Sequence, residues 1–438
     1  MIECSFLLKS LEPLRSVLRA IIKQGGKPYL VGGIVRDLVL GLQVKDLDIE
    51  VHGITLEDLE ACLKQFGPVK LVGKSFGVLR LHHLDVDWSL PRKDSKGRKP
   101  TVEIDPNMTI EDACRRRDLR MNAMVIDIAQ ILEGTCEIID IFHGLQDIKE
   151  QKLRAVDKAL FLDDPLRFFR VMQFIGRFEM LPDDELNYMC SKMDVVVAKE
   201  RIYEEVKKLL LKSKRPSLGF RWLLNICRLK DIFPQLHALV GVQQRSDYHP
   251  EGDVFEHTMQ ALDAAAQFQE YANEEEKFLI MLGVLCHDLG KPISTDEKLS
   301  AVGHEKEGIP LCKQFLKIFT DDTFLIPAVC KLVKYHLRPP QLFEQKSGVK
   351  AYKRLAVKLA PQVSIRQLAI VTLCDIQGRN PQGSLPLTNK YLGEFNQFLE
   401  IADKAKVTHG PEEPVLLGRH LMDVVEPGPK MGELLKNN

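Results

Sequence analysis

The sequence lacks the features of a membrane, secreted or zinc-ribbon protein. None of its 438 residues lie in a run approaching the ~20 apolar residues that a membrane-spanning helix needs, so we expect no membrane association. The ten cysteines include no CxxC pair and have no regular spacing, which indicates reduced thiols in a cytoplasmic protein rather than a disulfide framework. Five charged residues interrupt residues 1–22, so this segment predicts an amphipathic helix and not a signal peptide.

The chain also has no net charge, because 61 Lys and Arg residues balance 61 Asp and Glu residues. The total therefore gives no sign of a nucleic-acid partner. The distribution is uneven, since residues 151–230 contain 17 basic and 11 acidic side chains. Such a segment is either a phosphate-binding face or a solvated helix surface, and charge alone does not separate the two. The length predicts two to four globular domains.

Alternating strand and helix patterns up to residue 143 predict an α/β unit with a small sheet. The expected strands are at 28–31, 46–51, 77–81, 86–90, 121–128 and 137–141, with a helix at 34–42 after the first. The polar stretch 92–111 predicts a mobile loop. After residue 144 the spacing is helical, and helices are expected at 146–157, 165–178, 183–193, 200–212 and 218–227. A further helical block begins near 236, and five of the twelve histidines lie in it between His249 and His336.

Two acidic residues of the second expected strand indicate metal-assisted phosphoryl transfer. Residues two apart in a strand point to the same face, so Asp46 and Asp48 present neighbouring carboxylates. These repel one another without a cation, and Mg²⁺ prefers oxygen ligands of this kind. A third carboxylate is expected at Asp87, on the strand 86–90, and its alternative is an ordinary surface aspartate.

A glycine turn precedes the helix at 34–42. Gly32 and Gly33 allow backbone N–H groups to approach a phosphate, and the following helix N-terminus favours negative charge. Arg36 lies on that helix and is placed to reach the same phosphate. Phosphoryl transfer needs mainly positioning and charge stabilisation, which such a set can supply. The alternative is a tight strand–helix turn beside a solvated acidic strand.

These motifs, in this order, resemble one enzyme family. The segments LVGGIVRD at 30–37 and DLDIE at 46–50 resemble the signature of the class II tRNA nucleotidyltransferase and bacterial poly(A) polymerase family. Further family blocks are matched by GKSFGV at 73–78, RRD at 116–118, NAM at 122–124, DPLR at 164–167 and ERI at 200–202. The chain departs from the family pattern at Asp163, where Glu is usual, and at 88–91, where small residues are usual.

The resemblance implies roles for individual residues of the head. It assigns the catalytic Mg²⁺ to Asp46 and Asp48, whereas the departure at 88–91 lies beside Asp87, the third carboxylate expected from the strand pattern. It assigns the triphosphate to Gly32, Gly33 and Arg36, and the ribose and phosphate site to Arg116, Arg117, Asp118 and Asn122. It assigns nucleotide selection to Asp164 and Arg167, with Arg170 in the same motif.

Asp164 and Arg167 also have a direct physical interpretation. Three residues apart on a helix, they would project from one face. A carboxylate accepts from the exocyclic amine of cytosine or adenine, and a guanidinium donates to the neighbouring ring acceptor. Guanine and uracil carry a carbonyl at the amine position, so the pair predicts selection of CTP and ATP. The alternative is an intrahelical salt bridge.

A second constellation in the later helical block predicts a metal site. The expected ligands are His257, His287, Asp288 and Asp375, and a Leu-Gly-Lys sequence follows the His-Asp pair. This order resembles the HD phosphohydrolase superfamily. Mixed imidazole and carboxylate ligands suit a divalent ion such as Mg²⁺, Ni²⁺ or Mn²⁺, and an ion held this way hydrolyses phosphoesters. His304 and His336 either extend this site or bind phosphate.

Taken together, the resemblances imply an α/β nucleotidyltransferase head with a small mixed sheet, followed by an all-α neck, body and HD domain. The expected boundaries are 1–143 for the head, 144–235 for the neck and body, 236–380 for the HD domain and 381–438 for a C-terminal helical tail. This order resembles the bacterial CCA-adding branch that carries an HD domain.

The implied activity is addition or repair of the 3′-terminal CCA of tRNA from CTP and ATP, with release of pyrophosphate. The HD domain would add phosphatase or 2′,3′-cyclic phosphodiesterase activity. The expected partners are tRNA and the two nucleotides, not DNA, and the chain is expected to be a monomer or a homodimer. The acceptor stem would be gripped through its phosphates by Lys207, Lys208, Lys212, Lys214 and Arg215. The alternatives are a poly(A) polymerase and a metal-dependent phosphohydrolase whose N-terminal half only binds RNA.

Overall fold

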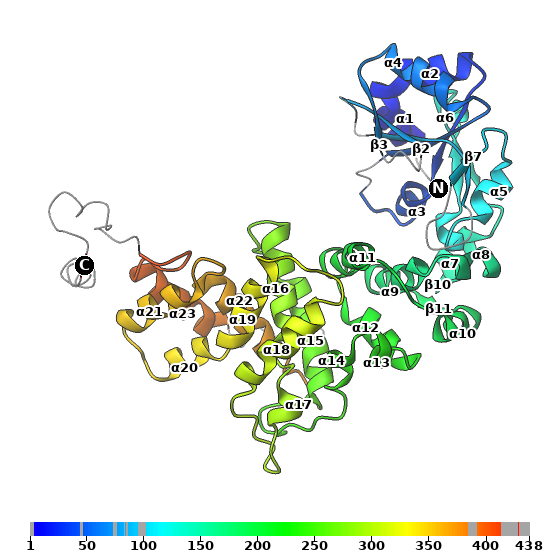
Figure 1. The fold of residues 1–438 in the computed structure, drawn as a ribbon. Helices are drawn as coiled ribbons and strands as arrows, with labels where there is room; N and C mark the ends of the chain where they lie inside the picture. The colour runs from blue at the N-terminus through cyan, green and yellow to red at the C-terminus, as the bar shows by residue number, and fades with distance from the viewer. Residues whose placement is uncertain are drawn as a thin grey trace. The chain divides into compact units, whose positions relative to one another are not determined.

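The computed structural model describes residues 4–43, 47–72, 77–82, 84, 86–94, 102–383, 392–412 and 428 (Figure 1). The chain forms two compact units, Met1–Ala198 and Lys199–Asn438. The border between them falls inside the segment that the sequence assigns to neck and body, so the four expected domains stay a prediction. In the described part of the chain, no helix combines the length and apolar character that crossing a membrane requires.

A mixed sheet of seven strands organises the described part of the N-terminal unit, in the order β3-β4-β5-β2-β1-β8-β9. Its strands are β1 (Lys27–Val31), β2 (Leu47–His52), β3 (Val69–Val72), β4 (Val78–Leu81), β5 (Val86–Ser89), β8 (Val125–Asp127) and β9 (Ile138–Ile139). β2 and β5 run parallel, whereas the other neighbours run antiparallel. The predicted α/β head with a small mixed sheet is therefore confirmed, and β3 is a strand that the sequence pattern missed.

Alternation along the strands gives the sheet an apolar face and a polar face. Ile49 and Val51 of β2 are fully buried in the main core, together with Trp88 of β5. The elements that cover this apolar face are α1 (Cys4–Leu11), η1 (Glu12–Leu14), α2 (Arg15–Lys23), α4 (Leu56–Lys64) and α6 (Ile128–Leu132) (Figure 1). Asp48 and Glu50 consequently belong to the opposite face, where polar chemistry is possible.

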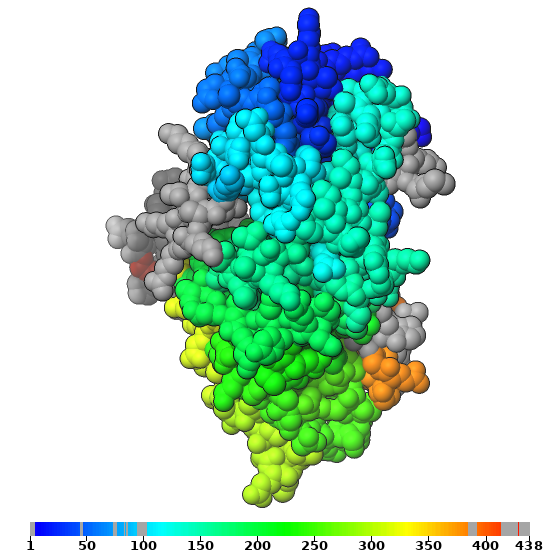
Figure 2. Space-filling view, turned by 90° about the vertical axis from the view of Figure 1, so that its right-hand side faces the viewer, coloured from blue at the N-terminus to red at the C-terminus, as the bar shows by residue number. Residues whose placement is uncertain are grey.

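The polar face is covered in part by α5 (Ile110–Arg115) and by the chain that follows it. Cys114 and Ala123 pack there against Tyr29 and Val31 of β1. α5 begins after Thr109, whose side-chain oxygen accepts a hydrogen bond from the Asp112 backbone N–H at 3.1 Å and so caps the helix. Figure 2 shows this part of the chain, coloured cyan, at the surface of the N-terminal unit.

Three expectations for the head are wrong in detail. The stretch 92–111 contains the antiparallel pair β6 (Arg92–Asp94) and β7 (Val102–Ile104) and the start of α5, while 95–101 lie outside the described residues. The strand expected at 121–128 is divided into η2 (Arg120–Asn122), β8 and α6, because Asp127 caps α6. The helix expected at 1–22 is interrupted at η1, which contains a proline that lacks the N–H of a continuous helix.

The neck begins as the helical spacing predicts, with α7 (Gly144–Glu150), α8 (Lys158–Asp163), α9 (Leu166–Phe178) and α10 (Asp184–Lys192). The helix expected at 146–157 ends early, because Gln151 adopts a left-handed conformation with φ 53°. The next residues form β10 (Lys152–Leu153), which pairs in parallel with β11 (Leu181–Pro182).

The described part of the C-terminal unit is helical. Its helices are α11 (Lys199–Lys212), α12 (Ser217–Asn225), α13 (Leu229–Ile232), α14 (Pro234–His237), α15 (Val254–Gln267), α16 (Glu274–Cys286), α17 (Lys291–Ser294), α18 (His304–Leu316), α19 (Leu325–Tyr335), α20 (Arg338–Glu344), α21 (Val349–Leu359), α22 (Ile365–Gln377) and α23 (Leu392–Lys404). α16 packs against α15, α19 and α22 in the centre of the unit (Figure 1). These helices are apolar where they meet, so the few polar side chains that they bury require polar partners.

Candidate functional site

The acidic residues of the head lie side by side at the junction of β2 and β5. The register of these parallel strands pairs Asp48 with Asp87, about 4.8 Å apart strand to strand. The Asp87 carboxylate also accepts hydrogen bonds from Arg80 on β4, with Nε at 2.8 Å and Nη2 at 2.6 Å. Asp46 lies outside the described residues. The expected triad of carboxylates stays a prediction, and the structure adds a cation, Arg80, beside it.

Glu50 is a buried residue of this site that the sequence pattern did not single out. It lies two residues after Asp48 on the same face, and its carboxylate is buried. Its Oε2 lies 3.1 Å from Arg116 Nη2 and 3.8 Å from Arg117 Nη2, and its Oε1 lies 3.1 Å from His52 Nε2. Burial opposes ionisation, but the His52 contact and the two guanidinium groups outweigh it and lower the pKa of Glu50 to about 2. Glu50 therefore orients both arginines.

Replacement of Glu50 by glutamine is expected to lower the stability of the N-terminal unit by about 1–3 kcal/mol. A hydrogen bond to a charged group contributes roughly that amount, and both arginines would lose their carboxylate. Urea unfolding followed by Trp88 fluorescence, in a Trp222→Phe background, reports this unit alone. Glu57→Gln, which removes an exposed carboxylate from α4, is the matched control. Equal unfolding midpoints for the two variants would contradict the orienting role.

The glycine turn brings two arginines close to the backbone. Gly32 has φ 73°, and a Cβ at this position would lie 2.5 Å from Arg117 Nη1. The positive φ favours glycine at this position, and the Arg117 guanidinium packs against the turn. Arg36, by contrast, is buried and donates to Asn122 Oδ1 at 2.7 Å and to Asp37 Oδ1 at 2.8 Å. In this structure the Arg36 guanidinium links α3 (Gly33–Val39) to η2 through its hydrogen bond to Asn122. The phosphate contact of Arg36 stays a prediction.

Asp118 is the centre of a second buried network. Its Oδ2 accepts from Arg170 Nε at 2.6 Å, and its Oδ1 accepts from Asn122 Nδ2 at 2.9 Å and from the Leu119 N–H at 2.8 Å. Burial opposes ionisation, but Arg170 and Asn122 prevail and hold the pKa of Asp118 well below its usual range. Asp118 is therefore an ionised acceptor. An ionised carboxylate can accept a hydrogen bond from a sugar hydroxyl, which is the contact predicted for Asp118.

The expected placement of Asp164 and Arg167 on one helix face is wrong. α8 ends at Asp163, and Asp164 has an extended backbone with φ −119° and ψ 101°. The physical reason is Pro165, which disfavours the helical conformation of the residue before it. Asp164 Oδ1 instead accepts from the Leu166 N–H at 3.1 Å at the start of α9.

Arg167 occupies the first turn of α9 and is held by backbone carbonyls. It donates through Nη1 to the Arg117 carbonyl at 3.4 Å and through Nη2 to the Arg116 carbonyl. The segment Arg116–Asp118 is thus held from both sides, by Glu50 on the sheet and by α9. The nucleotide-selecting role of Asp164 and Arg167 stays a prediction.

The second centre lies inside the C-terminal unit, where four residues from three helices converge. These are His257 of α15, His287 and Asp288 at the end of α16, and Asp375 of α22, and all four are buried. His257 Nε2 lies 3.1 Å from Asp375 Oδ1 and 3.3 Å from His287 Nε2. His287 Nε2 in turn lies 3.2 Å from Asp288 Oδ2.

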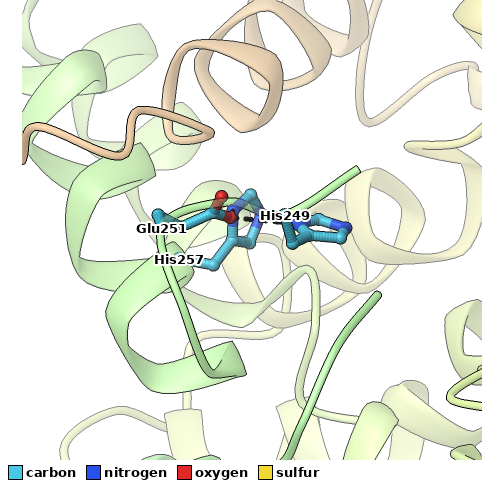
Figure 3. A group of neighbouring side chains, drawn as sticks. All are labelled: His249, Glu251 and His257. Carbon is cyan, nitrogen blue, oxygen red and sulfur yellow. Dashed lines mark hydrogen bonds and ion pairs between the residues drawn. The ribbon is translucent and has the colours of Figure 1, made fainter. Parts of the chain in front are cut away.

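Outer contacts fix the direction of the two histidines. Glu251 Oε1 lies 2.7 Å from His257 Nδ1 and 2.9 Å from His249 Nδ1 (Figure 3). The carbonyl oxygen of Val284 lies 2.7 Å from His287 Nδ1. A carboxylate or carbonyl acceptor at Nδ1 places the ring proton there and leaves the lone pair on Nε2. Metal-bound histidines are held in this way. Glu251 is not among the predicted ligands, although the sequence His249-Pro-Glu251 shortly before His257 carries a signal for it.

The four residues fit a divalent metal ion. Imidazole nitrogens and carboxylate oxygens suit such ions, and the separations of 3.1–3.3 Å are those of ligands that share one ion. Two cations adjoin the carboxylates: Lys291 Nζ lies 2.7 Å from Asp288 Oδ2, and Arg379 Nη2 lies 3.1 Å from Asp375 Oδ1. These cations are placed to meet the negative charge of a phosphoester.

An apolar cavity of about 490 Å³ adjoins this centre. Asp375 and Arg379 form part of its wall, and its aromatic lining comes from Tyr248, Phe343, Phe395 and Phe398. A cavity of this size and lining accommodates a small organic group next to the charged centre.

Comparisons with known proteins agree with these two centres. The Poly A polymerase head domain family matches residues 28–154, and the HD domain family matches residues 254–376. The fold and the sites therefore define a nucleotidyltransferase that carries an HD domain.

Curated relatives of similar sequence identify a family within this class of nucleotidyltransferases. A multifunctional CCA protein of Mannheimia succiniciproducens is 34% identical over 369 residues, which cover 80% of this chain and 84% of the relative. Another, of Acinetobacter baumannii, is 32% identical over 404 residues, which cover 88% of this chain and 92% of the relative. The chain belongs to the family of multifunctional CCA proteins, as the sequence motifs predict.

Solved structures show the same fold. An apo form of a CCA-adding enzyme has a TM-score of 0.61 at 19% identity, over 99% of this chain and 93% of that chain. A Thermotoga maritima CCA-adding enzyme complexed with tRNA has a TM-score of 0.57 at 21% identity, over 98% of this chain and 90% of that chain.

Proposed function

We propose that the protein adds or repairs the 3′-terminal CCA of tRNA from CTP and ATP, and that its HD domain hydrolyses phosphoesters. The observation that carries the first part is the polar face of the sheet, where Asp48 and Asp87 are paired and Glu50 orients two arginines. Family membership supports it, as do related CCA-adding enzymes solved with tRNA, ATP and CTP.

Different residues of the head are proposed to bind the metal ion and the triphosphate during nucleotidyl transfer. Asp46, Asp48 and Asp87 are proposed to hold Mg²⁺, which supplies charge stabilisation at the reacting phosphate when bound. The turn at Gly32 and the packed Arg117 position the triphosphate. The 3′ oxygen of tRNA forms a bond to the α-phosphorus and gives up its proton, while the bond to the departing pyrophosphate breaks.

Nucleotide choice is proposed to rest on Asp164 and Arg167. Backbone carbonyls of the Arg116–Asp118 segment accept hydrogen bonds from Arg167. They fix the position of its guanidinium next to the proposed nucleotide-binding residues. A carboxylate beside it favours bases that carry an amine next to a ring acceptor, namely cytosine and adenine.

The test is nucleotide addition to a tRNA transcript that lacks its 3′ CCA. We expect addition of C, C and A followed by a stop when CTP and ATP are supplied with Mg²⁺, and no addition from UTP or GTP. Sequencing of the 3′ ends measures the result. Long A tails would support a poly(A) polymerase instead, and no addition would leave the HD domain as the active half.

The HD domain is proposed to act on phosphoesters that carry an aromatic group such as a nucleobase. The metal polarises the phosphate and activates water when bound. Lys291 and Arg379 hold the phosphate charge, and the aromatic cavity beside Asp375 receives the organic group.

Replacement of Phe343 by alanine is expected to raise the KM for a nucleoside 2′,3′-cyclic phosphate about 10-fold. Base–aromatic stacking contributes about 1–3 kcal/mol. The KM for glycerol phosphate, which has no ring, should stay unchanged. Steady-state kinetics on both substrates measures the difference, and an equal effect on the two would argue against base binding in the cavity.

A further inference from the structure

Five residues of α9 form a stripe that contacts the head. Successive members of this stripe are three or four residues apart, a spacing that places side chains on one side of a helix. They are Arg167, Arg170, Phe174, and then Arg177 together with Phe178. The contacts of Arg167 and Arg170 with the segment Arg116–Asp118 attach the N-terminal end of the stripe. The C-terminal end of the stripe has no role in the predicted nucleotide site.

An ion pair attaches this C-terminal end to α3. Arg177 Nη2 donates to Asp37 Oδ2 at 3.1 Å, and Asp37 Oδ1 accepts from Arg36 Nε at 2.8 Å. Asp37 therefore binds one guanidinium from each of the two helices. The side chains of Arg177 and Asp37 are only 20% and 17% exposed, so solvent screens this pair less than it screens a pair on the surface.

The two phenylalanine rings of the stripe meet guanidinium groups from both helices. Arg36 Cζ lies 4.6 Å from the ring centroid of Phe178 and 5.4 Å from that of Phe174. On α9 itself, Arg177 Cζ lies 4.7 Å from the Phe178 centroid, and Arg170 Cζ lies 5.1 Å from the Phe174 centroid. A guanidinium within about 6 Å of a ring centroid is attracted to the ring face. These contacts add to the ion pair and hold α9 against α3.

The head segments that α9 contacts are those proposed to bind the nucleotide. Arg167 and Arg170 hold the segment Arg116–Asp118. Arg177 and the two rings hold α3, which begins directly after the turn at Gly32. About ten residues, or roughly 15 Å of helix, separate the two points of attachment. A helix attached at both ends is restrained against tilting, whereas a helix attached at one end pivots about it.

We propose that Arg177 and Asp37 are positioning residues of nucleotide selection. Their ion pair fixes the direction of α9 and thereby the place of the Arg167 guanidinium relative to the turn at Gly32. The base and the triphosphate belong to one nucleotide, so the elements that receive them need a fixed separation. This inference deepens the proposed choice of CTP and ATP and rests on it. Arg177 and Asp37 act through Arg167 and do not contact the base.

The accuracy of nucleotide addition tests the proposal. Arg177→Met keeps an apolar contact for Phe178 but removes the charge, and Asp37→Asn removes the acceptor with almost no change of shape. In both variants we expect the ratio of kcat/KM for CTP to kcat/KM for UTP to fall about 10-fold on a tRNA transcript that lacks CCA. Arg177→Lys, which keeps the charge, should recover most of this ratio. Arg19→Met, which removes an exposed arginine from α2, is the matched control and should leave the ratio unchanged.

The double variant Arg177→Met/Asp37→Asn should resemble Asp37→Asn alone, because Arg177 has then already lost its acceptor. An unchanged ratio in Arg177→Met and Asp37→Asn would overturn the proposal, even if kcat falls for both nucleotides, because that pattern indicates a purely structural role. Equal losses of the ratio in Arg177→Lys and Arg177→Met would contradict a role for the charge. A wild type that adds no nucleotide, or that does not prefer CTP to UTP, would instead refute the proposed function itself.

Discussion

We expect the Asp48→Asn variant to lose CCA addition by about 1,000-fold or more. Asparagine keeps the shape of the side chain but removes the charge that the proposed Mg²⁺ needs. A metal ion contributes several kcal/mol of transition-state stabilisation, and each 1.36 kcal/mol corresponds to a factor of ten. Single-turnover addition of CMP to a tRNA transcript that lacks CCA measures the loss.

Two controls accompany this measurement: a second activity of the same variant and a matched variant. Phosphoester hydrolysis should be unaffected in Asp48→Asn, because the HD centre is built entirely from residues of the C-terminal unit. Glu57→Gln, an exposed carboxylate on α4, should retain full addition. Retained addition in Asp48→Asn would remove the carboxylate pair of β2 and β5 from the proposed mechanism, whereas equal loss of both activities would indicate a folding defect.

We expect the His287→Ala variant to show the reverse pattern and to lose phosphoester hydrolysis by more than about 100-fold. The His287 Nε2 atom is central to the group of His257, His287, Asp288 and Asp375, because it lies within 3.3 Å of His257 Nε2 and Asp288 Oδ2. Loss of even an outer contact to a ligand costs about 10–100-fold in metal affinity, so loss of a ligand costs more. Hydrolysis of a nucleoside 2′,3′-cyclic phosphate over a range of Ni²⁺ concentrations measures both effects.

CCA addition should remain normal in His287→Ala, and His409→Ala is its matched control because that histidine is exposed. Restoration of hydrolysis by excess Ni²⁺ would indicate weakened binding with intact chemistry. Full hydrolysis without added metal would contradict a metal role for His287. Together the Asp48 and His287 variants separate the two activities proposed for one chain.

The sequence predicted which residue types form the two centres better than it predicted how their side chains are arranged. The Asp46 and Asp48 pattern, the Gly32 turn and the His287-Asp288 pair are local signals, because their chemistry follows from spacing along one strand, turn or helix end. Asp164 and Arg167 show the limit of such signals. Their spacing suggested one helix face, but Pro165 divides the segment, and Arg167 is oriented by carbonyls some fifty residues earlier in the chain.

Contacts between distant segments decided which polar residues act together. Glu50 looks like an ordinary acidic strand residue until Arg116 and Arg117 meet its buried carboxylate. Glu251 likewise acquires a role only because its carboxylate lies against His257 and His249. Neither partnership leaves a periodic signal, since the partners come from separate elements.

The sequence by itself determined the fold class, the family and the residue types of both centres, because each depends on local spacing and on ordered motifs. Tertiary structure alone decided that β2 and β5 run parallel with Asp48 opposite Asp87, and that His304 lies against both Asp288 Oδ1 and His336. Register and helix packing set these pairings, and both depend on how apolar faces pack together across the chain rather than on any single segment.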